Sequence, residues 1–289
     1  KPAEVGTSVF AMDAGNSSTT QGFTSGFPVD FALSKKTSAT SNWEATARLI
    51  QKKYLLTNST NAEATFDKLT FDDNTGWNTH NAYDSVWQAF MFKRHAGFDV
   101  VTYTGNGTGQ TPYSQIPHSL NKIPEMMWVK RRNSSRSWFV YHKGLDGGNN
   151  PETHYLLLDS SNTEGDEDTT LNDTAPTSTH FTLGTSSTTN GNNDTYLAML
   201  FASTAVSKVG YYAGNGSTQT ISLGFQPRFA IVKPLISGYD WYVVDTTRGW
   251  GSGNDNYMFL NGQNVQAPSS FGEPTSTGWL LDGNATHLN

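Results

Sequence analysis

KRRNSSRSW, residues 130–138, is the middle copy of a pattern that occurs three times in this chain of 289 residues. The two end residues of the stretch, a lysine and a tryptophan, recur at the same separation: Lys35 and Trp43, Lys130 and Trp138, Lys233 and Trp241. Each lysine closes an apolar run that follows a proline, at residues 28–33, 124–129 and 227–232. The chain is therefore one unit written three times.

Three more features flank each copy in the same order. A Gly-Asn turn lies upstream, at Gly15-Asn16, Gly105-Asn106 and Gly214-Asn215. Downstream come a Tyr-led apolar run, at residues 54–58, 155–159 and 257–261, and then a polar-Thr-x-aromatic step, at residues 74–77, 178–181 and 276–279. Self-similarity of this kind determines the architecture before any local propensity does.

The repeats divide the chain into a lead-in (residues 1–8) and three units (residues 9–96, 97–205 and 206–289). The first two units end on a closing strand, at residues 86–92 and 196–202, but the third stops at Asn289, where that strand is due to begin. An unpaired sheet edge invites association. Three solutions stay open: the lead-in pairs back, a neighbouring subunit covers the edge, or the chain continues.

Composition favours strands, since aromatic residues reach 12% and charged residues only 15%. Residues 43–54 have local helical character, but the equivalent stretches after Trp138 and Trp241 are rich in aromatic and β-branched residues, so we expect a strand there too. The prediction is an all-β protein of three tandem β-sandwich repeats of jelly-roll type. The alternative is a β-propeller closed by the N-terminal strand.

Charge and composition exclude several classes of partner and chemistry. The net charge is -6 without a basic block, which argues against nucleic acid. The one basic cluster, residues 130–136, is interpreted as a solvated turn, with an anionic ligand left open. There are no cysteines, and no apolar run approaches the length of a membrane span, so we expect neither disulfides nor membrane insertion. Without a signal peptide or an initiator Met, the chain is expected to be a processed product or part of a longer one.

Catalytic signatures are missing from the sequence, so we expect no enzyme. It contains no nucleophile elbow, no phosphate-binding loop and no zinc-binding helix motif. The seven histidines lack metal-ligand spacing, and the acidic clusters at residues 72–74 and 166–168 do not fit a calcium loop, so neither metal nor cofactor is expected. A carboxylate pair for glycoside cleavage stays open.

One loop is a candidate ligand site. Trp250 lies in the glycine-rich stretch 248–255, which offers little to bury it, and Asn254 and Asp255 stand beside it. An indole stacks on a sugar ring while amide and carboxylate groups bind the hydroxyls. Tyr239, on the preceding turn, is a weaker candidate. The competing interpretation is an aromatic lid on the protein's own sandwich.

Several sequence segments resemble the repeat domain of tail-fibre and related virion proteins of marine bacteriophages, cyanophages among them. They are FKRHAGFDVV (92–101), YTGNG (103–107), KRRNS (130–134), WFVYH (138–142), GFQPRF (224–229) and WYVVD (241–245). The resemblance covers nearly the whole chain. It implies an external virion protein, part of a fibre, that forms a homo-oligomer, commonly a trimer.

Three hypotheses for function follow. The first is a tail-fibre segment that attaches to a host cell-surface glycan or protein, strengthened by several copies per virion. The second is a structural head-decoration or fibre-spacer protein, whose contacts are with other virion proteins and which a large exposed apolar patch favours. The third, a glycan depolymerase, is the weakest because neither a β-helix repeat nor a carboxylate pair is evident.

Overall fold

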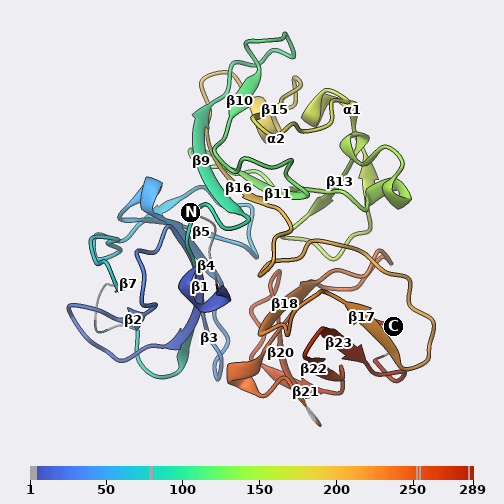
Figure 1. Ribbon diagram of the computed structural model, residues 1–289. Helices are drawn as coiled ribbons and strands as arrows, with labels where there is room; N and C mark the ends of the chain where they lie inside the picture. The colour runs from blue at the N-terminus through green and yellow to red at the C-terminus, as the bar shows by residue number, and fades with distance from the viewer. Residues whose placement is uncertain (1–4, 78–80, 82, 252, 254, 286) are drawn as a thin grey trace.

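The protein is an all-β ring of three lobes (Figure 1). The computed structural model describes residues 5–77, 81, 83–251, 253, 255–285 and 287–289. In these residues the α-helices are two single turns, α1 (Asp168–Leu171) and α2 (Ser187–Asn190), and no helix is long and apolar enough to cross a membrane. The blue, green and orange lobes of Figure 1 follow the three sequence units in order.

Each unit is built on one large antiparallel sheet. The first two sheets have the same order, β1-β8-β3-β4-β5-β6 and β9-β16-β11-β12-β13-β14, and the third is β18-β19-β20-β21. The bounds are β1 (Phe10–Ala14), β3 (Phe31–Lys36), β4 (Glu44–Ala47), β5 (Lys53–Leu56), β6 (Ala64–Thr65), β8 (Trp87–Phe92), β9 (Phe98–Thr104), β11 (Met126–Arg131), β12 (Phe139–His142), β13 (His154–Leu157), β14 (Gly165–Asp166), β16 (Thr195–Phe201), β18 (Phe229–Val232), β19 (Tyr242–Asp245), β20 (Asp255–Phe259) and β21 (Ala267–Ser269).

A small outer sheet accompanies each large one. The pairs are β2 (Phe23–Thr24) with β7 (Gly76–Trp77), and β10 (Gln115–Pro117) with β15 (His180–Thr182); the third unit has β17 (Gln219–Ser222), β23 (Gly278–Leu281) and β22 (Glu273–Thr275). The aromatic residue of each polar-Thr-x-aromatic step, Trp77, Phe181 or Trp279, is buried in a hydrophobic cluster of its own unit.

The large sheets also share a single inner core. Alternate residues of a strand point to opposite faces of a sheet, so on β11 Met127 and Val129 face the outer cluster while Trp128 faces the inner one. The inner cluster contains buried residues of all three units, Trp43, Trp138 and Trp241 among them. These three tryptophans therefore have an equivalent packing role in the three units. The units are not independent domains, because the inner core of each is completed by residues of the other two.

The repeated tryptophans close the ring. Each indole nitrogen donates a hydrogen bond to a backbone carbonyl of the neighbouring unit: Trp138 to Leu56 (2.8 Å), Trp241 to Leu157 (3.0 Å) and Trp43 to Phe259 (2.7 Å). The second unit thus binds the first, the third binds the second and the first binds the third. A buried N–H without an acceptor is costly, so each unit requires its neighbour.

The repeated lysines follow the same cycle. Each ammonium donates to a neighbouring unit's carbonyl: Lys130 to Thr60 (3.0 Å), Lys233 to Ser161 (3.4 Å) and Lys35 to Gln263 (3.1 Å). A second bond goes to the lysine's own loop, as from Lys130 to the carbonyl of Arg136 at 2.7 Å. Burial lowers the pKa of each of the three ammonium groups to about 8.

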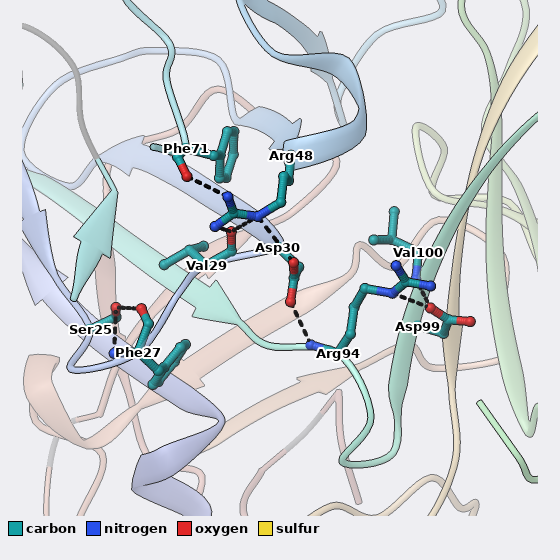
Figure 2. A network of polar contacts seen from close by, with 9 residues as sticks. All are labelled: Ser25, Phe27, Val29, Asp30, Arg48, Phe71, Arg94, Asp99 and Val100. Carbon is teal, nitrogen blue, oxygen red and sulfur yellow. Dashed lines mark hydrogen bonds and ion pairs between the residues drawn. The ribbon is translucent and has the colours of Figure 1, made fainter. Parts of the chain in front are cut away.

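A polar network fixes the junction of the first two units (Figure 2). Arg48 donates to the carbonyl of Val29 (2.8 Å) and to the Asp30 carboxylate (3.2 Å), which accepts the backbone N–H of Arg94 at 2.9 Å. The guanidinium of Arg94 in turn binds Asp99 at 2.6 Å, where β9 begins. The turn between β8 and β9 is therefore held from both sides.

The structure confirms one local prediction from the sequence and contradicts another. Residues 43–54 form strands β4 and β5 around a 3-10 turn, so the repeat was a better guide than local helix propensity. The propeller closure is wrong, because β1 pairs with β8 of its own unit and not with the third sheet. The second Gly-Asn turn requires glycine at position 105, because a Cβ there would collide with the backbone at Gly191, and Gly107 directly after the turn has a φ of 70°.

We predict that Trp138→Phe lowers the free energy of unfolding by about 1–3 kcal/mol more than Trp128→Phe does. Both substitutions remove the same ring volume from the inner core, but the indole nitrogen of Trp128 has no hydrogen-bond partner in the described part of the chain. Urea denaturation of the two variants measures the difference. Equal losses would mean that the bond between units contributes nothing.

We also predict that stability rises with pH from 8 upwards, since the folded pKa of Lys130 is about 8 and its ordinary value is 10.5. Below pH 8 both states carry the proton. Above it the unfolded chain binds more protons than the folded one, so the free energy of unfolding increases up to about pH 9.5, before tyrosines in the unfolded chain begin to ionise. Lys130→Met removes about a third of this rise, because Lys35 and Lys233 have similarly lowered pKa values, whereas Lys68→Met, at an exposed position, leaves it unchanged. A rise that Lys130→Met does not affect would contradict the assignment.

Candidate functional site

The predicted site around Trp250 is closed. The indole is 3% exposed and packs edge-on against Trp279, with ring centroids 5.0 Å apart at 80°. The expectation that a glycine-rich loop leaves it exposed is wrong, because the loop folds back onto the outer cluster of the third unit. A ring in this position has no face for a sugar.

The neighbours of Trp250 are engaged elsewhere. Asp255 is fully buried and accepts the backbone N–H groups of Gly251 (2.9 Å) and Phe271 (2.8 Å), and burial raises the pKa of its carboxyl group. The half-buried Tyr239 ring lies against His287, with centroids 4.7 Å apart. Asn254 lies outside the described residues. The carboxylate of Asp255 therefore closes its own loop.

The basic cluster separates into buried, paired and free members. Lys130 is buried, and Arg131 and Arg132 form ion pairs with Asp194 (2.5 Å) and Glu63 (2.7 Å). Arg136 is exposed, and its guanidinium donates to the hydroxyl of a serine, Ser187 Oγ, at 2.6 Å. Among the described members of the cluster, Arg136 is the arginine without a carboxylate partner.

Arg136 borders a hollow of about 400 Å³ in the second unit, here called the Arg136 hollow. This volume lies within the range of about 300–1,000 Å³ that is usual for small-molecule sites. Its lining combines a guanidinium, a phenol ring, a carboxylate and several hydroxyls: Arg136, Tyr155, Glu167, Thr60, Ser137 and Thr188.

Tyr155 supplies the aromatic surface of the hollow. The ring pairs with the buried Phe139, at 6.4 Å and 28°, and lies against Gly165, where a Cβ would approach the ring to 2.8 Å. Glycine at position 165 thus leaves room for the ring. In the described part of the chain the Tyr155 hydroxyl has no hydrogen-bond partner, so it is available to a ligand.

Glu167 stands on a different segment of the hollow, before helix α1. One carboxylate oxygen accepts the backbone N–H of Thr169 at 3.2 Å and so caps the helix. This fixes the carboxylate, and its other oxygen has no hydrogen-bond partner among the described residues. The described residues contain no group of three or more His, Cys, Asp or Glu side chains placed to hold a metal ion.

The residues of the Arg136 hollow are not adjacent in the sequence, although two signals in the sequence point to them. One is the basic cluster that contains Arg136, and the other is the polar segment at residues 160–179, which contains Glu167 and forms α1. Inserted surface segments often carry function. Tyr155, by contrast, occupies a position that is aromatic in all three units, so its exposure follows only from the fold.

Residues 73–277 match a family described as a domain of unknown function (DUF7483). The chain belongs to this family. The matched span extends from the end of the first unit into the third and includes every lining residue of the Arg136 hollow except Thr60. No curated protein and no solved structure was found to match the chain.

We predict that Trp250→Ala lowers the free energy of unfolding by about 3–5 kcal/mol, because it empties a buried indole site. Tyr239→Ala, at the half-buried partner position of the original hypothesis, costs about 1 kcal/mol or less. Thermal or urea denaturation of the two variants tests this. A Trp250→Ala variant as stable as the parent would mean that the indole is exposed in solution.

Proposed function

We propose that the protein is a non-enzymatic adhesin, a segment of a virion tail fibre, and that the Arg136 hollow binds a sugar residue of a host cell-surface glycan. The virion assignment is supported by the resemblance of the repeats to tail-fibre domains. The glycan assignment is supported by one observation above all: an accessible tyrosine ring that shares a hollow with Arg136 and Glu167.

The chemistry of the hollow suits a sugar. The C–H face of a pyranose packs on an aromatic ring, and its hydroxyls accept from a guanidinium and donate to a carboxylate. Serine and threonine hydroxyls, which both donate and accept, complete the polar wall. Tyr155 is held on β13, Arg136 by its bond to Ser187 and Glu167 by the cap of α1, so little entropy is lost when the sugar binds.

Binding without cleavage is supported by the single carboxylate that lines the hollow among the described residues. Glycoside hydrolysis uses a pair of carboxyl groups across the scissile bond. Glu167 is also committed on one side to the cap of α1.

Weak single sites suffice in a fibre. If the chain forms a homo-oligomer, such as the trimer that the resemblance implies, each assembly carries several hollows. Linked sites raise avidity far above the affinity of any one of them.

The finer description of the fold belongs to the same proposal. We interpret each unit as a jelly-roll-like β-sandwich, with the large sheet as one layer and the small sheet as the other. Support comes from the hydrophobic cluster that fills the space between them in every unit. This layout leaves the loops free to vary, as an adhesin requires.

The test is saturable binding of the labelled protein to candidate host cells and to a glycan array. We expect Tyr155→Ala and Arg136→Ala each to weaken binding about tenfold or more, since each removes a main contact. The matched control is Tyr54→Ala, which changes the equivalent tyrosine of the first unit, and periodate treatment of the cells should abolish binding by the parent. If both variants of the hollow still bind as the parent does, the site lies elsewhere. If the protein binds no host cell and no glycan, the adhesin hypothesis is wrong.

A specific observation favours a second candidate, the structural virion protein held by contacts with other virion proteins. A largely apolar groove opens beside β18 in the third unit. Exposed apolar surface of this kind marks a protein contact. The two functions are compatible, since a fibre segment needs both an attachment and a receptor site.

A further inference from the structure

A groove of about 530 Å³ lies along β18. This strand is at the side of the third unit that faces the other two (Figure 1). One wall is β18 itself, with Phe229 and Ile231, and the other is the segment 206–212. Phe10 and Phe92 of the first unit form part of its end, and the Phe229 ring lies 5.1 Å from the ring of Phe10. The lining is therefore mostly apolar.

Comparison of the three units shows what the groove lacks. In the first unit β8 pairs with both β1 and β3, and in the second unit β16 pairs with both β9 and β11. The third sheet begins at β18, the equivalent of β3 and β11. Its first flank, which precedes the Gly214-Asn215 turn, has no strand structure.

Both flanks of the vacant position are nevertheless in place. Val209 lies five residues before Gly214 and is buried in the inner core. Its equivalent in the second unit is Val100 on β9, which lies five residues before Gly105 and is buried in the same core. The hydrogen-bonding edge of β18 is free in the described residues, because its one strand partner is β19. A position that lies between the free edge of β18 and the segment 206–212, and that is lined by apolar side chains, suits a β-strand.

The strands β8 and β16 define the chemistry of the occupant. Each is apolar on both faces: Leu197 and Met199 of β16 face the inner core, and Ala198 and Leu200 face the outer one. An occupant of the third unit meets the same two cores, through Ile231 on one face and Val232 on the other. It therefore needs a continuous apolar run in place of the alternating pattern of a surface strand.

At one end of this position the third unit has a positively charged residue, whereas the first two units have an acidic residue there. The residue directly before β3 is Asp30, and the residue directly before β11 is Glu125; each carboxylate accepts a backbone N–H two positions beyond the end of the central strand, from Arg94 and Ser203 respectively. The equivalent residue before β18 is Arg228, which borders the groove. Its guanidinium has no ion pair or hydrogen bond with any described residue, so it is free for a carboxylate.

We propose that this groove binds a β-strand of a partner polypeptide, antiparallel to β18, apolar on both faces and with a carboxylate at its C-terminal end beside Arg228. The described chain cannot supply the strand, because β8 and β16 are already the central strands of their own sheets. Strand addition of this kind gains affinity from main-chain hydrogen bonds and specificity from the side-chain positions. The proposal is independent of the Arg136 hollow.

The probe is a dye-labelled peptide with the sequence of residues 195–203, in which an aspartate replaces the final serine. We expect saturable binding, slower hydrogen exchange of the amides at residues 229–232, and a higher melting temperature, since a ligand that binds only the folded state stabilises it. A control peptide with serine at the positions of Leu197 and Met199 should not bind. The absence of saturable binding and of protection at β18 would overturn the proposal.

A charge swap tests the end of the strand. Arg228→Glu should weaken binding of the aspartate peptide by about tenfold or more, and a peptide with lysine in place of the aspartate should restore it, because the pair is then reversed. An unchanged affinity would refute the role of Arg228. Sedimentation of the protein alone tests whether a second copy of the chain is the occupant. Self-association that is lost when the peptide is added would identify a second copy, and would overturn the assignment to a different polypeptide.

Discussion

The closed cycle of hydrogen bonds between units is the constraint on which the rest of the structure depends. Each of the three repeated indoles in the inner core has an acceptor for its N–H, which is costly to leave unpaired, and the acceptor belongs to the neighbouring unit in all three cases. The lysine at the start of the motif meets the same neighbour a few residues further along its chain. The spacing between lysine and tryptophan thus allows both side chains to reach one stretch of backbone. Removing one unit would leave these groups unsatisfied and open the shared core.

This arrangement accounts for the third unit. The Lys233 and Trp241 contacts place it on the second unit, and its carbonyls at Phe259 and Gln263 receive the first. Its position therefore does not depend on a central strand. The groove beside β18 is the consequence, because the ring holds both flanks of a position that no described residue fills. A rigid ring also holds the segments of the second unit that line the Arg136 hollow in a fixed geometry.

The sequence predicted the repeated unit, the all-β class and the main strands, because equivalent residues such as Trp43, Trp138 and Trp241 reveal the register. It did not distinguish a row of units from a ring, since Trp138 does not indicate which carbonyl it will meet. The prediction of a ligand site at Trp250 was wrong for a similar reason. Whether Trp250 is exposed depends on its contact with Trp279, and the space beside the Tyr155 ring depends on glycine at position 165. Contacts distant in sequence decide both.

The most direct test of the ring is the cooperativity of unfolding, measured by scanning calorimetry on the intact chain. If the units depend on one another for their cores and hydrogen bonds, they unfold together, and the calorimetric enthalpy equals the van't Hoff enthalpy in a single transition. Separate transitions, or a calorimetric enthalpy about three times the van't Hoff value, would show three independent domains and contradict the account.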